Sequence, residues 1–309
     1  MRTRLPFALL AALSCSLASV PAHARARTFV ASYGNDANAC TFGSPCRNFQ
    51  QAVNVVDPGG EVTAIDSAGF GPILITKAVT ITSPNGVEAG IVLVSGGNSI
   101  TINAGPFDAI TLSGLVIDGA GVGTNGILFS DGGYLIMQDC VIRNMTGDGI
   151  HFASNFISHL SVTNSFVGHN GGNGILVQPV GSASVTAVFE RVRAQYNGAN
   201  GYGITLDASL TGGSVNGTAT DTVSSDNGGG FSTSAGQNNQ SNLTVLRSVA
   251  ANNHTGVQGG AGNSTVFISE TTITNNVLPC NNIVKSYQDN TVNGNQNADF
   301  CGVSQISKE

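Results

Sequence analysis

Short segments in which apolar and polar residues alternate recur along most of the chain. In one series a small residue, usually glycine, stands directly before an apolar-x-apolar unit, as in "GDGIHF" and "GGNGILV". The apolar members of this series are Ile73/Ile75, Ile91/Leu93, Ile110/Leu112, Ile127/Phe129, Ile150/Phe152, Ile175/Val177, Ile204/Leu206, Phe231 and Val257. Because side chains alternate between the two faces of a strand, the pattern predicts many short strands, each with about two residues facing a core.

Two further markers lie between these units. A second apolar-x-apolar series comprises Val79/Ile81, Ile100/Ile102, Leu115/Ile117, Leu135/Met137, Leu160/Val162, Leu243/Val245 and Val266/Ile268. An asparagine follows a small or apolar residue by three positions at Asn144, Asn170, Asn197, Asn227, Asn253 and Asn276. The segments "DCVIRNMTGDGI" and "NSFVGHNGGNGI" therefore contain one unit written twice. Such self-similarity is typical of a repeat architecture.

These repeats predict an all-β, right-handed parallel β-helix with three short strands per coil. Strands this short gain stability by stacking on equivalent strands about 4.8 Å away. Glycine at the corners would permit positive φ, and stacked asparagines could form a ladder of amide hydrogen bonds. An antiparallel sandwich is the alternative for a chain rich in Gly, Ser, Thr and Asn, but it does not require a recurring Gly-apolar-x-apolar unit.

The amino-terminal residues 1–24 are predicted to be a signal peptide. Arg2 and Arg4 precede an apolar run, and Ala22-His23-Ala24 has the small-x-small form of a cleavage site. A lipoprotein signal is the alternative, with Cys15 as the lipidated residue. No other segment has the length and apolarity of a membrane span. We therefore expect a secreted or periplasmic protein.

The ends of the solenoid are expected to carry caps, because an open β-helix exposes its core and its strand edges. Residues 25–60 are predicted to form an amino-terminal cap, residues 61–276 the repeats and residues 277–309 a carboxy-terminal cap. The first cap should contain a short amphipathic helix that begins with Ser44 as N-cap and Pro45 at its first position. Its buried face would comprise Phe49, Ala52, Val53 and Val56.

Five cysteines remain after signal cleavage. Cys40 and Cys46 flank a short loop, and Cys280 and Cys301 bracket the carboxy-terminal segment. In an oxidising compartment we expect these four residues to form two local disulfides, although spacing does not establish pairing and unpaired thiols stay open. Cys140 lies inside a repeat and is predicted to be a small buried residue.

The chain has few charges. Lys and Arg number 12 and Asp and Glu 18 among 309 residues, for a net charge of −6. Removing residues 1–24 leaves 10 basic against 18 acidic residues, a net charge of −8. This balance offers no basic surface for nucleic acid or anionic lipid, and it would repel polyuronates unless a local cation intervened.

The repeats, the predicted cap helix and the export signal together resemble the pectin-lyase-like superfamily of right-handed β-helix proteins. Within it, "GNDANACTFGSPCRNFQQAV", "GGEVTAIDSAGFGPILITKAVTI" and "SYQDNTVNGN" resemble a group of exported bacterial β-helix proteins. The resemblance implies this fold for nearly the whole mature chain. For function it implies calcium-dependent lyases with an Arg base, or hydrolases with paired Asp residues, Gly-His-Gly and Arg-x-Lys.

The hydrolase motifs are not found in this sequence. Asp148 stands singly in "TGDGI", and His169 lies in "GHN" without the second glycine. Glycoside hydrolysis needs two carboxylates across the scissile bond. A lyase is the remaining enzymatic option, and Arg191 and Arg193 could share a strand face with carboxylates nearby. A solvated surface ion pair is the simpler reading of this pair.

His151 lies between two inward residues, so it should point outward, in one column with Leu128, Leu176 and Thr205 of other coils. These neighbours offer no carboxylate to orient a catalytic base. The candidates for catalysis are therefore Arg191, Arg193, Asp148 and His151, and no zinc-ligand spacing is present.

We expect an exported structural or carbohydrate-binding module without a cofactor, whose partner is an extracellular polysaccharide or a cell-surface component. A polysaccharide lyase or glycoside hydrolase is the alternative, and calcium would be expected only for a lyase.

Overall fold

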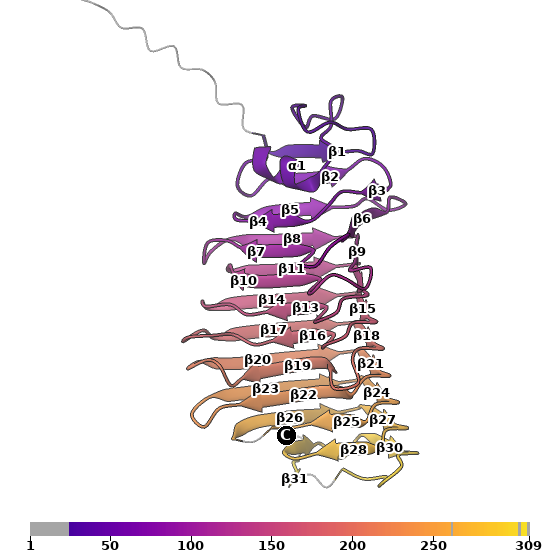
Figure 1. Cartoon of the computed structure of the whole chain (residues 1–309). Coiled ribbons are helices and arrows are strands. Elements are labelled where there is room, and N and C mark those ends of the chain that lie inside the picture. The colour runs from indigo at the N-terminus through magenta and orange to yellow at the C-terminus, as the bar shows by residue number, and fades with distance from the viewer. Residues whose placement is uncertain (1–24, 261, 302–303, 308–309) are drawn as a thin grey trace, which may run out of the picture.

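The computed structural model describes residues 25–260, 262–301 and 304–307. Successive coils lie on one another along a single axis, from the indigo amino-terminal end to the yellow carboxy-terminal end (Figure 1). Each coil contributes one strand to each of three parallel sheets. The predicted right-handed parallel β-helix is confirmed, and the antiparallel sandwich is excluded. The expected signal peptide and Cys15 lie outside the described residues.

The strands of each sheet are far apart in sequence but adjacent in space. Sheet 1 consists of β1 (Arg27–Val30), β2 (Glu61–Ala64), β5 (Val79–Thr82), β8 (Ala109–Ser113), β11 (Tyr134–Gln138), β14 (Ser158–Thr163), β17 (Val185–Glu190), β20 (Ser214–Thr220), β23 (Gln240–Leu246), β26 (Asn263–Ser269), β29 (Val284–Ser286) and β31 (Ser304–Gln305). Sheet 2 consists of β3 (Ala68–Gly69), β6 (Ala89–Val92), β9 (Leu115–Asp118), β12 (Val141–Arg143), β15 (Phe166–Gly168), β18 (Arg193–Gln195), β21 (Val223–Ser225), β24 (Val249–Ala251), β27 (Thr272–Thr274) and β30 (Thr291–Asn293). Sheet 3 consists of β4 (Ile73–Ile75), β7 (Ile100–Asn103), β10 (Ile127–Asp131), β13 (Ile150–Phe152), β16 (Ile175–Val177), β19 (Tyr202–Ala208), β22 (Gly229–Ala235), β25 (Thr255–Gln258) and β28 (Leu278–Asn281).

The core consists of columns of identical or similar side chains in register. Ile150 pairs with Ile127 on one side and Ile175 on the other, and all three are fully buried. In the adjacent column the rings of Phe129 and Phe152 stack with their centroids 4.1 Å apart. Each coil therefore buries its apolar residues against the coils above and below it.

The two apolar series of the sequence do not correspond to two sheets over their whole length. From Ile127 onward the first series follows sheet 3, and from Leu135 onward the second series follows sheet 1. Nearer the amino terminus both series mix strands of different sheets; Ile91, for example, lies in β6 of sheet 2. The reason is that every sheet buries alternate residues, so the period of two marks a strand without marking its sheet.

Glycine at the recurrent Gly-apolar unit has a different role from the one expected. Gly149 and Gly174 do not have positive φ, whereas the corners are made by other residues with positive φ, such as Asn164 and His169. A Cβ on Gly149 would lie 2.6 Å from the carbonyl oxygen of Gly174 in the next coil. These glycines are therefore required for close backbone approach between coils.

A buried ladder of asparagine amides runs along the corner between sheets 2 and 3. Its members are joined by amide hydrogen bonds of 2.9–3.2 Å in the order Asn170, Asn197, Asn227, Asn253, Asn276 and Asn295. The predicted ladder is confirmed for Asn170, Asn197, Asn227, Asn253 and Asn276. The prediction that it begins at Asn144 is wrong. The equivalent position is Met145, whose backbone N–H donates to Asn170 Oδ1 at 3.1 Å. Asn144 lies one residue earlier with a φ of 61°.

The short helix α1 (Phe49–Val55) lies beside β1 and β2 at the amino-terminal end (Figure 1). Phe49, Ala52, Val53 and Val56 are buried against the core, as predicted. The predicted start at Ser44 and Pro45 is wrong, because the N-cap is Asn48. The preceding segment is held extended, since Cys46 is bonded to Cys40 and bridges to Val30.

Asp36 secures the start of this helix. Its carboxylate accepts hydrogen bonds from the backbone N–H groups of Arg47 and Asn48 and from the Asn48 amide, at 2.6–2.9 Å. Burial alone would raise the pKa of Asp36, but these hydrogen bonds and the Arg47 charge hold it below its ordinary value of 3.8.

Acidification is therefore expected to weaken the amino-terminal cap through Asp36. A carboxyl whose pKa is lower in the folded state stabilises it fully above the unfolded pKa, here near 3.8, and loses that contribution as the pH falls through the folded value. The free energy of unfolding of Asp36→Ala should thus lie below that of the parent at neutral pH, and the difference should shrink on acidification. Chemical denaturation across this range checks it; a pH-independent difference would contradict the assignment.

At the carboxy-terminal end the stacking continues beyond residue 276. The strands β28, β29 and β30 pair in parallel with β25, β26 and β27, so the segment expected as a cap begins with another coil. Cys280 of β28 is bonded to Cys301. Both expected disulfides are therefore present. Cys140 is buried, as predicted, and burial raises the pKa of its thiol to about 12.

Candidate functional site

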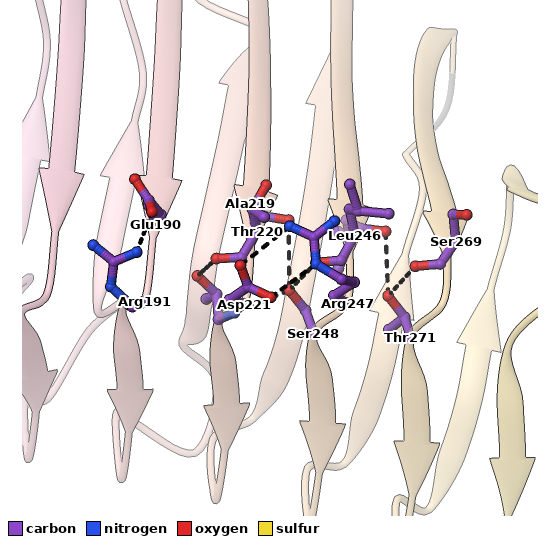
Figure 2. A network of polar contacts seen from close by, with 12 residues as sticks. Glu190, Arg191, Ala219, Thr220, Asp221, Leu246, Arg247, Ser248, Ser269 and Thr271 are labelled. Carbon is purple, nitrogen blue, oxygen red and sulfur yellow. Dashed lines mark hydrogen bonds and ion pairs between the residues drawn. The ribbon is translucent and has the colours of Figure 1, made fainter.

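Arg191 belongs to a column of polar residues at the corner between sheets 1 and 2. This corner column, made of residues that all have positive φ, comprises Asp139, Asn164, Arg191, Asp221, Arg247 and Glu270. Arg191 Nε donates to Asn164 Oδ1 at 2.9 Å and its guanidinium forms an ion pair with Glu190. Arg247 donates to both oxygens of Asp221, at 3.0 and 3.2 Å (Figure 2).

The corner column is exposed, and from Arg191 onward basic and acidic residues alternate along it. The hydrogen bond from Arg247 holds the pKa of Asp221 below its ordinary value, and Arg191 contributes in the same direction. Exposed pairs of this kind contribute little to stability. The guanidinium groups of Arg191 and Arg247 link neighbouring coils through Asn164 and Asp221.

Arg193 does not share a face with Arg191, contrary to expectation. Arg191 ends the corner after β17 with a φ of 52°, and Arg193 begins β18 in a different sheet. The guanidinium of Arg193 lies 5.9 Å from the centre of the Phe166 ring and donates to Gln195 Oε1 at 3.0 Å. The two arginines therefore form no joint acid-base patch.

The structure brings Asp148 and His151 together on the outer face of sheet 3. His151 Nδ1 lies 3.4 Å from Asp148 Oδ2, and both side chains are mostly buried. Asp148 Oδ1 accepts from the backbone N–H and the side-chain amide of Asn173, at 2.7 and 3.0 Å. The expected column neighbours of His151, Leu128 and Leu176, are confirmed. The expectation that it lacks a carboxylate partner is wrong, because the partner precedes it in the same coil.

Further polar side chains on this face escaped sequence analysis. Gln178 Nε2 donates to Asp207 Oδ2 at 2.6 Å. The Tyr202 hydroxyl donates to Gln258 Oε1 at 2.8 Å, two coils further on. The ring of Tyr202 occupies the space above Gly229, where a Cβ would lie 2.0 Å from it. In the sequence, the feature that corresponds to this arrangement is Gly229, which is in register with Tyr202 and leaves room for its ring.

The carboxylates Asp148 and Asp207 are too far apart to act as a hydrolytic pair. They lie two coils apart along the axis and five residues apart across the sheet, which corresponds to roughly 19 Å at about 4.8 Å per coil and 3.3 Å per residue. Glycosidases require about 5–9.5 Å between their two carboxyl groups.

Over residues 25–260, 262–301 and 304–307, no group of three or more His, Cys, Asp and Glu side chains could hold a metal ion. Within the same residues, no helix is long and apolar enough to cross a membrane.

The outer face of sheet 1 carries a depression of about 290 Å³ across β11, β14 and β17. The rings of Tyr134 and His159 stack along one side with their centroids 4.8 Å apart. Ile136 and Val188, which are 38% and 45% exposed, stand at its two ends with Ser161 between them. The outward residues along this part of sheet 1 thus form a small hollow that is largely apolar but contains hydroxyl groups.

The comparisons with known proteins identify the architecture. A crystal structure of the pectate lyase Pel9A is similar over 91% of this chain and 76% of its own, with a TM-score of 0.58 and 15% identity. A rhamnogalacturonan lyase is similar over 83% and 75%, with a TM-score of 0.54 and 15% identity. The chain has the pectin-lyase-like β-helix fold.

Two sequence comparisons add little about chemistry. A family model described as a domain of unknown function, DUF4957, matches residues 63–189 of this β-helix. No curated protein matches the chain significantly. At 15% identity the structural likeness extends to the fold alone, because function depends on the side chains that each chain places on that fold.

Proposed function

We propose that this pectin-lyase-like β-helix is an exported carbohydrate-binding protein that holds an uncharged sugar residue in the sheet-1 depression. The stacked rings of Tyr134 and His159 beside Ile136 and Val188 carry the proposal. A pyranose ring has an apolar face of C–H groups that packs on aromatic and aliphatic side chains. Its hydroxyl groups can bond to Ser161 and Thr186, which also line the depression.

The lining favours a neutral ligand. Its outward side chains are aromatic, aliphatic or hydroxyl-bearing, and it contains no Lys, Arg, Asp or Glu. A uronate carboxylate placed here would lose water without gaining a cationic partner, and this costs several kcal/mol in an apolar setting. The net charge of −6 opposes polyanions further. Export is supported by the predicted signal peptide and by two disulfides.

Filling the depression is expected to abolish binding. Ser161 faces outward between Ile136 and Val188, so Ser161→Phe should occupy the hollow without disturbing the core. A glycan array identifies neutral ligands of the mature protein, and titration calorimetry should then show affinity about tenfold or more weaker for the variant.

Thr244→Phe provides the matched control. Thr244 faces outward at the same column of sheet 1, three coils from Ser161. Equal affinities of the two phenylalanine variants would refute the sheet-1 site, as would an array on which no uncharged glycan is retained.

A polysaccharide lyase or hydrolase is the second candidate, and the Asp148–His151 pair supports it. A carboxylate 3.4 Å from Nδ1 would fix the orientation of the imidazole and leave Nε2 as a proton acceptor. The described residues do not offer a calcium site, so no step through calcium is assigned. Incubation with uronate and neutral glycans, followed by assays for unsaturated products and new reducing ends, tests this candidate. Activity lost in His151→Ala would establish it; no product from any glycan would exclude it for that panel.

A further inference from the structure

We propose a second sugar site at the corner between sheets 2 and 3, where the stacked rings of His169 and Tyr196 bind a neutral pyranose ring, so that one molecule bridges two glycan chains. This aromatic corner site shares no residue with the sheet-1 depression and stands independently of it. The bridging of two chains rests on the proposed function.

A hollow of about 550 Å³ runs along this corner over four successive coils, which is within the range of about 300–1,000 Å³ typical of small-ligand sites. The small residues Ala120 and Gly121 line it at one end, and His169 and Tyr196 line it toward the other. A Cβ placed on Gly121 would have no atom within 4 Å, so the space beside it is open.

The aromatic wall of the hollow is held in place by packing. The rings of His169 and Tyr196 are parallel to within 8°, with their centroids 4.9 Å apart. The Phe166 ring lies over Gly168, where a Cβ would be 2.5 Å from it, and its centroid is 6.2 Å from that of His169. These contacts fix the orientation of the imidazole before any ligand arrives.

One face of the His169 ring is left for a ligand. Tyr196, in the following coil, covers the other face. In the preceding coil the equivalent residue is Asn144, whose amide is directed away from His169 and donates to Asp118 Oδ1 at 3.0 Å. The uncovered face of the imidazole therefore borders the hollow.

Tyr196 occupies a backbone position that other coils give to asparagine or aspartate. The equivalent corner residues have φ between 56° and 61° and are Asn144, Asp226, Asn252 and Asn275. Tyr196 adopts the same left-handed conformation, with a φ of 57°, although asparagine adopts it far more readily than tyrosine. Since Tyr196 is also 52% exposed, it gains little from burial. A strained, exposed aromatic residue beside a hollow favours a binding role.

The groups around the rings select a neutral, hydroxyl-rich ligand. The described residues that line the hollow include no Lys, Arg, Asp or Glu. Thr146 Oγ1 donates to Gly123 O at 2.8 Å, so its lone pairs can accept from a ligand hydroxyl. The C–H face of a pyranose can pack on the imidazole while its hydroxyls reach Thr146 and the Tyr196 phenol.

The two sugar sites lie in the same coils on opposite sides of the solenoid. Each coil passes through sheets 1, 2 and 3 in turn, so the corner between sheets 2 and 3 is the one that sheet 1 does not border. The sheet-1 depression spans β11, β14 and β17, and the aromatic corner site follows β12, β15 and β18 of these coils. A glycan chain on one side therefore leaves the other side open to a second chain.

Tryptophan fluorescence tests the aromatic corner site alone, because the chain contains no Trp. Tyr196→Trp keeps an aromatic ring in the stack, and Ser161→Phe in the same chain fills the sheet-1 depression. Cellopentaose is the probe, since β-linked glucose carries its hydroxyls at the ring edge and C–H groups on both faces. Its addition should shift the emission to shorter wavelengths and saturate, as the indole is covered by sugar.

His169→Asn in this chain introduces the residue found at equivalent corners, so it should keep the fold and weaken cellopentaose binding at least about tenfold. Tyr33→Trp, at a tyrosine that is 68% exposed in the amino-terminal cap, is the control and should not respond. Tyr196→Asn alone should melt no lower than the parent. The site is overturned if the emission of Tyr196→Trp does not respond, if His169→Asn binds normally, if Tyr33→Trp responds equally, or if Tyr196→Asn melts clearly lower.

Light scattering from a hydroxyethylcellulose solution tests the bridge. The parent protein should raise the scattering, and His169→Asn and Ser161→Phe should each abolish the rise, because each leaves one site per molecule. No rise with the parent, or a rise that survives His169→Asn, overturns the bridge. Failure of the sheet-1 site would appear as equal scattering by Ser161→Phe and the parent, whereas failure of the aromatic corner site would appear as unchanged emission of Tyr196→Trp.

Discussion

Replacing Ile150 by aspartate is expected to unfold the protein at temperatures where the parent is stable. Ile150 is 0% exposed and lies in register between Ile127 and Ile175, so the carboxylate would enter a column of isoleucine side chains. Burying an unpaired charge, together with the loss of a large aliphatic side chain, should cost about 4–5 kcal/mol or more. That is a large part of the 5–15 kcal/mol typical of whole proteins. Thermal and urea denaturation followed by circular dichroism measure the loss.

Leu176→Asp is the matched control for this substitution. Leu176 lies in the neighbouring strand, adjacent in register to His151, and faces outward with partial exposure. The same carboxylate should therefore remain hydrated there and cost little. Similar melting temperatures for Ile150→Asp and the parent would show that Ile150 does not support the core, and equal losses in both variants would remove the distinction between inward and outward positions.

The fold could be predicted from the sequence because a solenoid repeats the same local problem in every coil. One inward position, for example, is occupied by isoleucine in three successive coils, at Ile127, Ile150 and Ile175. Because the same apolar pattern recurs in each coil, it can be recognised even where a single coil departs from it. The exceptions are positions where two residue types serve equally well. Met145 begins the asparagine ladder because that place needs only a backbone donor to Asn170, which any residue except proline supplies.

Corner geometry was harder to predict than strands. Non-glycine residues with positive φ, such as Arg191 and Tyr196, give no local signal, because asparagine and glycine are the types usually expected there. A corner at Arg191 separates Glu190 from Arg193 into different sheets, whereas the sequence alone suggested one continuous strand. Residues on the two sides of such a corner, such as Glu190 and Arg193, therefore do not share a face.

Only part of the candidate chemistry could be found in the sequence. Asp148 and His151 are both candidates from the sequence, but their contact is not predicted by the strand pattern. The pattern identifies the neighbours of His151 in adjacent coils, whereas Asp148 belongs to the corner that precedes it in the same coil. Tyr202 and Gln258 gave no motif, since their contact depends on register over three coils and on the open space at Gly229. Likewise, Tyr134 and Val188 are 54 positions apart and meet only through the pairing of β11, β14 and β17.

Replacing Asn227 by leucine is expected to be the most damaging change in the asparagine ladder. Asn227 Oδ1 accepts from the backbone N–H and the amide of Asn197, at 2.9 and 3.0 Å. Its Nδ2 donates to Ala194 O at 3.0 Å and to Asn253 Oδ1 at 3.2 Å. Leucine has similar size but leaves the Asn197 N–H and the Ala194 carbonyl without these partners inside the protein.

The expected loss is about 3 kcal/mol or more, because each buried group without a partner costs about 1–3 kcal/mol. Asn216→Leu makes the same substitution at an exposed, outward position of β20 and should change stability little. Urea denaturation of both variants measures the difference. Since neighbouring coils stabilise one another, the defect at Asn227 should also raise amide hydrogen exchange in the adjacent coils at Asn197 and Asn253. Equal stability of the two leucine variants would mean that the ladder adds nothing beyond the apolar columns, and exchange confined to residue 227 would mean that it does not couple the coils.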